Sequence, residues 1–337
     1  MKLASLKTGG RDGTLIVVSE NLQQAVRASD IADRLQDALE DWHNIAPQLQ
    51  ILAHQLEAGS AEGMFSLDPQ LLAAPLPRAY QWLDGSAYVN HVELVRKARG
   101  DTVPESYWHD PLMYQGGSDY LLGPCDDIVV ESENFGIDFE AEIAVITKDV
   151  PQAVSVEKAG DYIALVLLVN DVSLRRLIPD ELAKGFGFLH GKPPTAFSPV
   201  AVTPEALGKY WHNSSLHLPV QSYINGAIFG RPNAGVDLTF NFAQLIAHAA
   251  RTRPLSAGTI IGSGTISNRD RAVGSSCIVE RRTLEKIEQG NITTEFLHFG
   301  DVVKIMVEDE KGHNIFGTIE QKITQLQRNN NDGRVAA

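Results

Sequence analysis

An uninterrupted apolar run, Ile163–Val169, restricts the fold of this chain more than any other sequence feature. The run is far shorter than the roughly 20 residues that cross a bilayer, and its Ile, Leu and Val content favours a β-strand. No polar residue interrupts it, so a strand here has to be buried on both of its faces. The chain therefore needs a sheet that is covered on two sides, and its 337 residues are enough to supply that cover.

Composition and charge exclude several classes of function. The 29 Lys and Arg against 42 Asp and Glu leave a formal charge of −13 without a basic cluster, so we expect no nucleic-acid partner. Neither a spanning segment nor a signal-like apolar start occurs, so we expect a soluble, cytoplasmic protein with no membrane partner. The two cysteines, Cys125 and Cys277, are too few for a disulfide framework, and we expect them to be small core residues.

The first 70 residues differ from the rest of the chain. Gly13–Glu20 predicts a short strand, and Leu22–Leu56 has apolar residues at helical spacing, with Pro47 predicted to split it into two helices. We expect a small N-terminal α/β domain over residues 1–70, which provides packing or a dimer contact or covers the second domain as a lid. A larger domain over 71–330 and a frayed tail over 331–337 follow.

Short strand-like segments broken by glycine dominate the second domain. Strands are predicted at Ile128–Val130, Ile137–Thr147, Tyr162–Val169, Gln221–Phe229, Gly258–Ile261, Ser276–Glu280, Val302–Glu308 and Ile315–Ile323. Helices are predicted at Ser86–Ala98, Ser173–Lys184 and Phe242–Arg251. The pattern indicates an α+β fold that is mainly β. Because regular βαβ alternation and phosphate-binding glycine motifs are missing, we expect no nucleotide cofactor.

The stretch Asp138–Ala144 places three acids on one side of a predicted strand. Period-two alternation sends Asp138, Glu140 and Glu142 to one face and the apolar side chains to the other. Carboxylates two residues apart repel one another unless a cation or water compensates, and oxygen ligands suit Mg²⁺, Ca²⁺ and Mn²⁺. One hypothesis is a bound divalent cation, and the other is the solvated face of an antiparallel sheet.

Two further acids stand at positions where function often lies. Asp171 follows the buried run, at the rim of a core, where functional residues often lie. The alternative is that Asp171 or Ser173 is the N-cap of the next helix. Asp84 is predicted as the N-cap of helix Ser86–Ala98, about two turns before His91 and on the same face. A metal-binding Asp and a facing His are then geometrically possible, although isolated histidines are usually structural.

Together these segments resemble the fumarylacetoacetate hydrolase family of metal-dependent enzymes that act on short oxo acids. The shared features are an Asp seven residues before a His, a Tyr in a YxG turn, an ExE strand, an NDxSxR element, a GK followed by Ser-Pro, and SGTIS. In this chain they are Asp84 and His91, Tyr114, Glu140 and Glu142, Asn170, Asp171, Ser173 and Arg175, Gly191, Lys192, Ser198 and Pro199, and Ser263–Ser267.

The resemblance implies a β-roll catalytic domain with the metal at its mouth, a smaller N-terminal domain and a homodimer. It also implies that one divalent cation, Mg²⁺, Ca²⁺ or Mn²⁺, is held by four carboxylates. These are Asp84, Glu140, Glu142 and Asp171. Asp138, the third acid of the predicted strand, would stay outside the ligand set.

Further roles follow from the same resemblance. His91 would be the general base and Glu280 its orienting partner, with Glu285 and Glu288 as alternatives. Lys192 and Arg175 would form a cationic pair beside the oxygens where charge develops, which can stabilise an oxyanion or enolate. The alternative for Lys192 is a surface lysine in a loop, and for Arg175 a helix-face partner of a nearby acid.

Substrate contacts are implied for Tyr114, Thr265, Arg99 and Ser86. The chain departs from the family here, because NDVSLRRLIPDEL stands where animal fumarylacetoacetases have NDWSARD and further polar or aromatic contacts. Ser86 stands where a tyrosine is expected, although Tyr88 is close. Since the metal and base residues are kept while the substrate contacts differ, the prediction is a small oxo-acid substrate, with fumarylacetoacetate as one example.

Three functions are carried forward. The first is a hydrolase of the EC 3.7.1 type, as in aromatic amino acid catabolism, that cleaves a C–C bond in fumarylacetoacetate, giving fumarate and acetoacetate, or in a related acylpyruvate. The second keeps the fold and metal and makes the chain a 2-oxo acid hydratase, dehydratase, decarboxylase or isomerase. The third is a non-catalytic protein with a structural Ca²⁺. The pairing of His91 with an acid favours hydrolysis, because a water must be activated.

Overall fold

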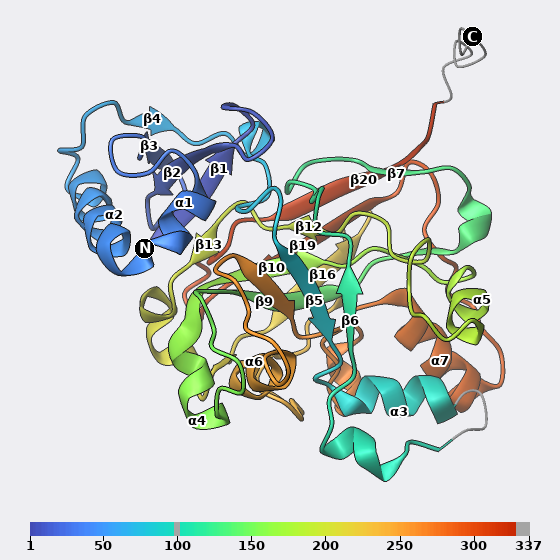
Figure 1. The fold of residues 1–337 in the computed structure, drawn as a ribbon. Coiled ribbons are helices and arrows are strands. Elements are labelled where there is room, and N and C mark those ends of the chain that lie inside the picture. Colours follow the sequence, from blue (N-terminus) through green and yellow to red (C-terminus); the bar gives the residue numbers. More distant parts are fainter. Residues whose placement is uncertain (98–101, 328–337) are drawn as a thin grey trace, which may run out of the picture.

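The computed structural model describes residues 1–97 and 102–327. Arg99 and the predicted tail, 331–337, therefore lie outside the described residues. Figure 1 shows a fold dominated by strands with few helices around them, and the N-terminal strands and helices gather at one end. The predicted mainly β, α+β class is confirmed. None of the described helices is long and apolar enough to cross a bilayer.

A mixed eleven-stranded sheet runs through the molecule in the order β4-β3-β2-β1-β13-β10-β9-β18-β5-β6, and β12 pairs with β10. Its strands are β1 (Lys2–Leu6), β2 (Thr14–Val18), β3 (Gln24–Arg27), β4 (Phe65–Ser66), β5 (Gln81–Gly85), β6 (Met113–Gly116), β9 (Ala141–Thr147), β10 (Ile163–Asn170), β12 (Ala196–Phe197), β13 (Ala201–Val202) and β18 (Thr259–Gly262). Strands β5 and β18 are parallel. Because β1 pairs with β13, the N-terminal strands extend the same sheet.

The apolar run forms β10 in the middle of this sheet, and every residue of β10 is buried. Val166 and Leu168 join one hydrophobic core, whereas Leu165 and Leu167 join the core on the opposite face. The predicted strand with two buried faces is thus confirmed. Its physical cause is the alternation of side chains along a strand, which sends neighbouring residues to opposite sides of the sheet.

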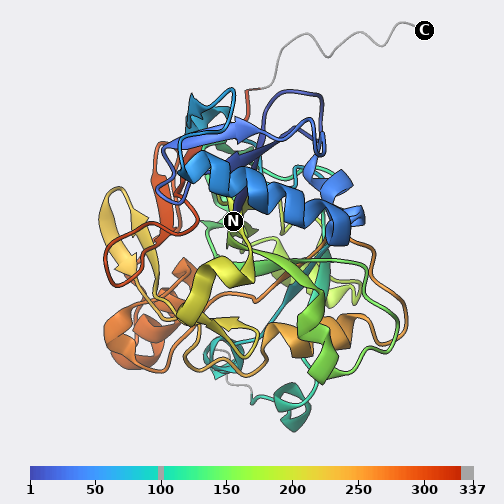
Figure 2. The same cartoon turned by 90° about the vertical axis from the view of Figure 1, so that its left-hand side faces the viewer.

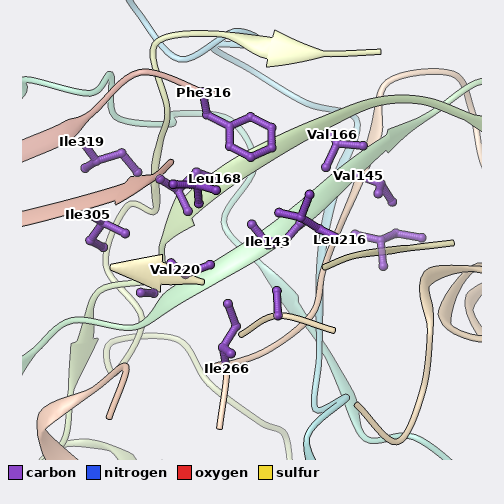
Figure 3. Close-up of a cluster of buried hydrophobic side chains, with 14 of the residues drawn as sticks. Ile143, Val145, Val166, Leu168, Leu216, Val220, Ile266, Ile305, Phe316 and Ile319 are labelled. Carbon is purple, nitrogen blue, oxygen red and sulfur yellow. The ribbon is translucent and has the colours of Figure 1, made fainter. Parts of the chain in front are cut away.

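A five-stranded sheet covers one face, in the order β17-β16-β19-β20-β7. Its strands are β7 (Ile128–Val130), β16 (Val220–Ile224), β17 (Ala227–Gly230), β19 (Val302–Val307) and β20 (Ile319–Gln325). Figure 3 shows Ile143 and Val166 of the large sheet in one cluster with Val220, Ile305 and Ile319 of the small one. Two short pairs complete the sheets, β8 (Ile137–Asp138) with β11 (Ser173–Leu174), and β14 (Trp211–His212) with β15 (Ser215–Leu216).

Helices cover the other face and the ends of the sheets. The α-helices are α1 (Leu35–Glu40), α2 (Trp42–Glu57), α3 (Val89–Lys97), α4 (Val156–Ala159), α5 (Ile178–Ala183), α6 (Phe242–Ala249) and α7 (Ile278–Gln289). Short 3₁₀ turns lie at Pro69–Leu71, Glu105–Trp108, Glu133–Phe135, Gly160–Tyr162, Pro204–Tyr210 and Arg271–Val273. Figure 2 shows α2 lying across the N-terminal strands, where it buries Leu49 and Leu56. The predicted domain boundary near residue 70 falls in the 3₁₀ turn Pro69–Leu71 and stays a prediction.

The prediction for Leu22–Leu56 was partly wrong. Gln24–Arg27 forms strand β3, and the break between the two helices lies at Asp41 rather than at Pro47, which lies inside α2. Pro47 and the residue four positions before it, His43, are both exposed. Water can therefore satisfy the carbonyl that loses its N–H partner, so the proline does not end the helix.

The predicted strand Gln221–Phe229 is instead a hairpin. Asn225 and Gly226 connect β16 and β17 with φ values of 52° and 79°. Asn-Gly favours this two-residue turn because both positions require a left-handed backbone. The Asn-Gly pair was the missed signal.

The predicted strand Ser276–Glu280 is also wrong, because α7 begins at Ile278. The buried carboxylate of Asp138 accepts hydrogen bonds from the backbone N–H groups of Ile278 and Val279, at 2.7 and 2.9 Å. These bonds satisfy donors that a helix leaves free in its first turn, so an acid 140 residues away in the sequence starts this helix.

Candidate metal centre and catalytic site

Four carboxylates that the sequence analysis grouped lie together in the fold. Each offers one oxygen, and these oxygens all lie within 4.8 Å of one another. All four side chains are buried. They are Asp84, Glu140, Glu142 and Asp171. Strand pairing produces this convergence, because β9 lies between β10 and β18, and β18 lies beside β5.

Asp84 lies in strand β5, so its predicted role as the N-cap of a helix is wrong. Helix α3 begins only at Val89. The SGTIS loop packs against this carboxylate: the Gly264 N–H donates to Asp84 Oδ1 at 3.1 Å. A Cβ on Gly262 would come within 2.5 Å of the same oxygen, so the close approach of β18 to Asp84 requires glycine there.

Asp171 does not cap a helix either, because α5 begins at Ile178, and Ser173 lies in strand β11. The Asp171 carboxylate instead accepts hydrogen bonds from Thr195 Oγ1 at 2.8 Å and from the hydroxyl of Tyr114 at 2.6 Å. The predicted YxG turn around Tyr114 is strand β6, which pairs Tyr114 with Asp84.

Two cations, largely shielded from solvent, bridge the acids. Lys192 Nζ donates to Glu140 Oε2 at 2.7 Å and also to Asp171 Oδ2. Arg175 donates to Glu140 Oε1 and, through Nε at 2.8 Å, to Asp138 Oδ2. Asp138 is not one of the four converging carboxylates, because it faces Arg175 and the start of α7.

The electrostatics of the cluster are unbalanced. Burial, and then the neighbouring charge of Asp171, raise the pKa of Asp84 well above its usual range. Burial and the charge of Asp84 do the same to the pKa of Glu142. At Glu140 burial opposes ionisation, but Arg175 and Lys192 outweigh it and lower the pKa. The surplus of negative charge therefore lies on the side of Asp84 and Glu142.

Glu142 carries the clearest sign of a missing partner. Its side chain is completely buried, and neither carboxylate oxygen has a hydrogen-bond partner among the described residues. Buried carboxylates are normally paired or bound to metal. Counting Asp138, five carboxylates are buried here, and among the described residues the cations that pair with them are Lys192 and Arg175. An all-oxygen donor set with this surplus of negative charge fits a divalent cation of the Mg²⁺, Mn²⁺ or Ca²⁺ type.

His91 and Glu280 form a pair beside the acids. His91 Nδ1 lies 2.8 Å from Glu280 Oε2, and the Glu280 side chain is 1% exposed. The residues come from α3 and α7, which lie side by side (Figure 1). Of the two alternatives to Glu280, Glu285 accepts from the backbone of Thr293 and Thr294, and Glu288 is exposed.

The predicted substrate contacts are only partly placed. Tyr114 packs edge-on against Phe188, with ring centroids 4.9 Å apart, and both rings lie near Lys192 Nζ. Thr265 is buried in the loop after β18, and Ser86 is partly buried just after β5, so both lie close in sequence to elements that hold Asp84. Arg99 lies outside the described residues.

Sequence reasoning missed several polar residues that hold the site. Thr195 binds Asp171, and its position three residues after Lys192 was the available signal. Asn170 was named in the NDxSxR element but without a role; it accepts from the Glu140 N–H at 3.3 Å and donates to Gln321 Oε1 at 3.0 Å. No local pattern marks Gln321, because it lies 151 residues from Asn170.

Comparison with known families gives two matches that together cover most of the chain. Residues 81–324 match the family model described as "Fumarylacetoacetate (FAA) hydrolase C-terminal". Residues 1–78 match the one described as "Fumarylacetoacetase N-terminal domain 2".

Individual relatives differ in their named activities. A 2,4-didehydro-3-deoxy-L-rhamnonate hydrolase of Sphingomonas sp. is 30% identical over 159 residues, 46% of this chain and 53% of the relative. An oxaloacetate tautomerase of Bacillus subtilis is 24% identical over 248 residues, 73% of this chain and 72% of the relative. The relatives thus include both a hydrolase and a tautomerase.

A solved structure shares the fold. Maleylpyruvate hydrolase from Sphingobium sp. SYK-6, in complex with manganese(II) and pyruvate, is 16% identical to this chain, with a TM-score of 0.62. The similarity covers 97% of this chain and all of that one. A family model that spans more than half of the sequence shows that this chain belongs to the fumarylacetoacetate hydrolase family.

Proposed function

We propose that this chain is a divalent-metal-dependent hydrolase that cleaves a C–C bond in a 1,3-diketo acid, such as fumarylacetoacetate or a related acylpyruvate. The observation that carries this proposal is the His91–Glu280 pair beside four converging carboxylates. We assign Asp84, Glu140, Glu142 and Asp171 as the metal ligands. A divalent ion bound there would act as a Lewis acid on a substrate carbonyl.

His91 is the general base of the proposed reaction. A hydrogen bond from Nδ1–H to the Glu280 carboxylate leaves Nε2 unprotonated and able to accept a proton from water. The carboxylate also stabilises the imidazolium that results, in the same way that acids support histidine bases elsewhere. Glu280 therefore orients His91 and holds its tautomer.

The chemical sequence needs one proton to move twice. Water gives a proton to His91 Nε2 and its oxygen attacks a carbonyl carbon of the substrate. The C–C bond then breaks, its electron pair leaves on the departing carbon as an enolate, and the His91 imidazolium returns the proton. Lys192 and Arg175 supply the positive charge that stabilises the oxyanion and the enolate.

A second candidate uses the same site for keto–enol tautomerisation of a 2-oxo acid. The Bacillus subtilis tautomerase, which matches 73% of this chain, favours it. In that reaction His91 would move a proton between carbon and oxygen, and no water would be consumed. Hydrolysis gives two acids and tautomerisation gives one, so product analysis separates the candidates.

The test is incubation of the purified chain with fumarylacetoacetate, acylpyruvates and oxaloacetate, with Mg²⁺ or Mn²⁺ and with a chelator. We expect loss of the diketone absorbance and two acid products by NMR only in the presence of metal. If oxaloacetate alone were converted and every diketo acid stayed intact, the proposed function would change from hydrolase to tautomerase. We also propose a homodimer, which light scattering coupled to size exclusion measures.

A further inference from the structure

A cavity lies beside the segment that leads into α7. Its volume is about 580 Å³, within the range of cavities that hold small ligands. Its wall combines the β16–β17 hairpin, the residues just before α7, and the outer side of α7 itself. The polar lining residues are Gln221, Tyr223, Arg231, Arg271, Ser275 and Arg281.

Three arginines converge on this cavity without carboxylate partners. None of Arg231, Arg271 and Arg281 forms an ion pair within residues 1–97 and 102–327, and no Asp or Glu of those ranges lines the cavity. The chain as a whole carries a formal charge of −13. These three arginines therefore contrast with Arg175 and Lys192 of the metal centre, which are both paired with carboxylates.

Two of the arginines are held in place by neutral groups. The Arg281 guanidinium lies over the Phe229 ring, 4.7 Å from its centroid, and Nη2 donates to the Phe229 carbonyl at 2.8 Å. Arg271 Nη1 donates to the Asn268 carbonyl at 3.0 Å. Each of these guanidinium groups has five N–H donors in a planar fork, so donors remain for a ligand after these bonds.

Apolar side chains also line this cavity. Ile228, Phe229 and Leu284 supply apolar surface around the arginines. The lining thus combines oxyanion donors with apolar contact area, which suits an organic anion better than a bare inorganic ion.

We propose that this cavity binds a small organic anion that carries carboxylate or phosphate groups, at a site separate from the metal centre. Planar forks of arginine match the oxygens of both groups in a bidentate manner. None of the residues proposed for metal binding or catalysis lines the cavity. The proposal does not depend on the reaction, because binding is measured without turnover.

Titration calorimetry with succinate and with phenyl phosphate tests the proposal and distinguishes the two kinds of oxyanion. We expect saturable binding of at least one probe, weakened by added NaCl because the attraction is electrostatic. Arg231→Gln and Arg271→Gln should each weaken binding about tenfold, the effect of losing one charge-assisted contact. Both residues are exposed, and Arg271 gives up one hydrogen bond to the Asn268 carbonyl, so we expect both variants to keep the fold; Arg281→Gln would also lose the contact with the Phe229 ring.

Arg27→Gln is the matched control. Arg27 is exposed on strand β3, so its replacement by Gln removes the same single charge at a position outside the cavity. We expect its affinity for the probe to equal that of the wild type. Equal affinities in the wild type, Arg231→Gln and Arg271→Gln, or no binding of either probe, would overturn the proposal. The proposal would also be overturned if the wild type and Arg27→Gln were dimers while Arg231→Gln and Arg271→Gln were monomers. The cavity would then be a contact surface for a second copy of the chain.

Discussion

Replacement of Glu142 by Gln should separate two effects of the carboxylate cluster: the loss of stability in the metal-free protein and the gain of stability when metal binds. Glu142 is completely buried, and neither of its oxygens accepts a hydrogen bond from the described residues. A buried amide costs less than a buried charge, so we expect metal-free Glu142→Gln to unfold at the same temperature as the metal-free wild type or higher. With metal the order should reverse, because the variant lacks one of four charged ligands.

The size of the reversal follows from linkage. A cation at 100 times its Kd stabilises the wild type by about 2.7 kcal/mol. If the variant binds about 100-fold more weakly, a magnitude seen for lost metal-site contacts, the same concentration adds only about 0.4 kcal/mol. At roughly 2.1 cal mol⁻¹ K⁻¹ of unfolding entropy per residue, 1 kcal/mol moves the Tm of this chain by about 1.4 °C. The metal should thus raise Tm by about 4 °C in the wild type and about 0.6 °C in the variant.

The assay is differential scanning calorimetry of both proteins after treatment with a chelator and then with Mg²⁺ or Mn²⁺ at about 100 times the Kd of the wild type. Glu285→Gln is the control, because Glu285 is a buried carboxylate bonded to Thr293 and Thr294 outside the cluster. It should lower Tm in both states and leave the increment from metal unchanged. An equal increment in the wild type and Glu142→Gln would refute the assignment of Glu142 as a ligand.

Three further predictions concern other parts of the molecule. His91→Asn should keep the increment in Tm from metal but lower the rate of hydrolysis at least ~100-fold in a steady-state assay. His54→Asn, a change at an exposed histidine, should leave the rate of hydrolysis unchanged. Normal turnover by His91→Asn would remove His91 from the mechanism. Asp138→Asn should cost about 3 kcal/mol in urea denaturation, because it removes the buried charge that binds Arg175 and the start of α7; an unchanged midpoint would contradict that role. At Glu285 burial opposes ionisation, but hydrogen bonds from Thr294 and Thr293 lower the pKa to about 2. Its contribution to stability should be present above about pH 4.3 and be lost as the pH falls toward about 2, so the wild type and Glu285→Gln should converge in stability over this range; a constant difference in urea denaturation at several pH values would contradict this.

Local sequence patterns predicted those features that depend on neighbours along the chain. The apolar run Ile163–Val169 can only be a strand buried on both faces, since its side chains alternate between two cores. The predicted strand Ile137–Thr147 is divided into β8 and β9, with Phe139 and Glu140 between them, so only Glu140 and Glu142 of its three acids join the cluster. The order of motifs was enough to group four carboxylates that prove to converge.

Patterns failed where local signals allow two conformations. Asp84 precedes a helix closely enough to resemble an N-cap, but pairing with β18 and β6 makes it part of strand β5. Ile278 and Val279 favour a strand by propensity, yet the Asp138 carboxylate satisfies their N–H groups and starts a helix. Tertiary contacts outweigh such preferences because propensities amount to only about 1 kcal/mol per residue.

Contacts between distant residues were decided by the folded structure alone. His91 and Glu280 are 189 residues apart, and they meet only because α3 and α7 pack together. The arginines at 231, 271 and 281 likewise share a cavity only after the β16–β17 hairpin packs near the start of α7. Periodicity determines which face of an element a side chain occupies, whereas sheet order and helix packing determine what that face meets, because burial and pairing act over the whole chain.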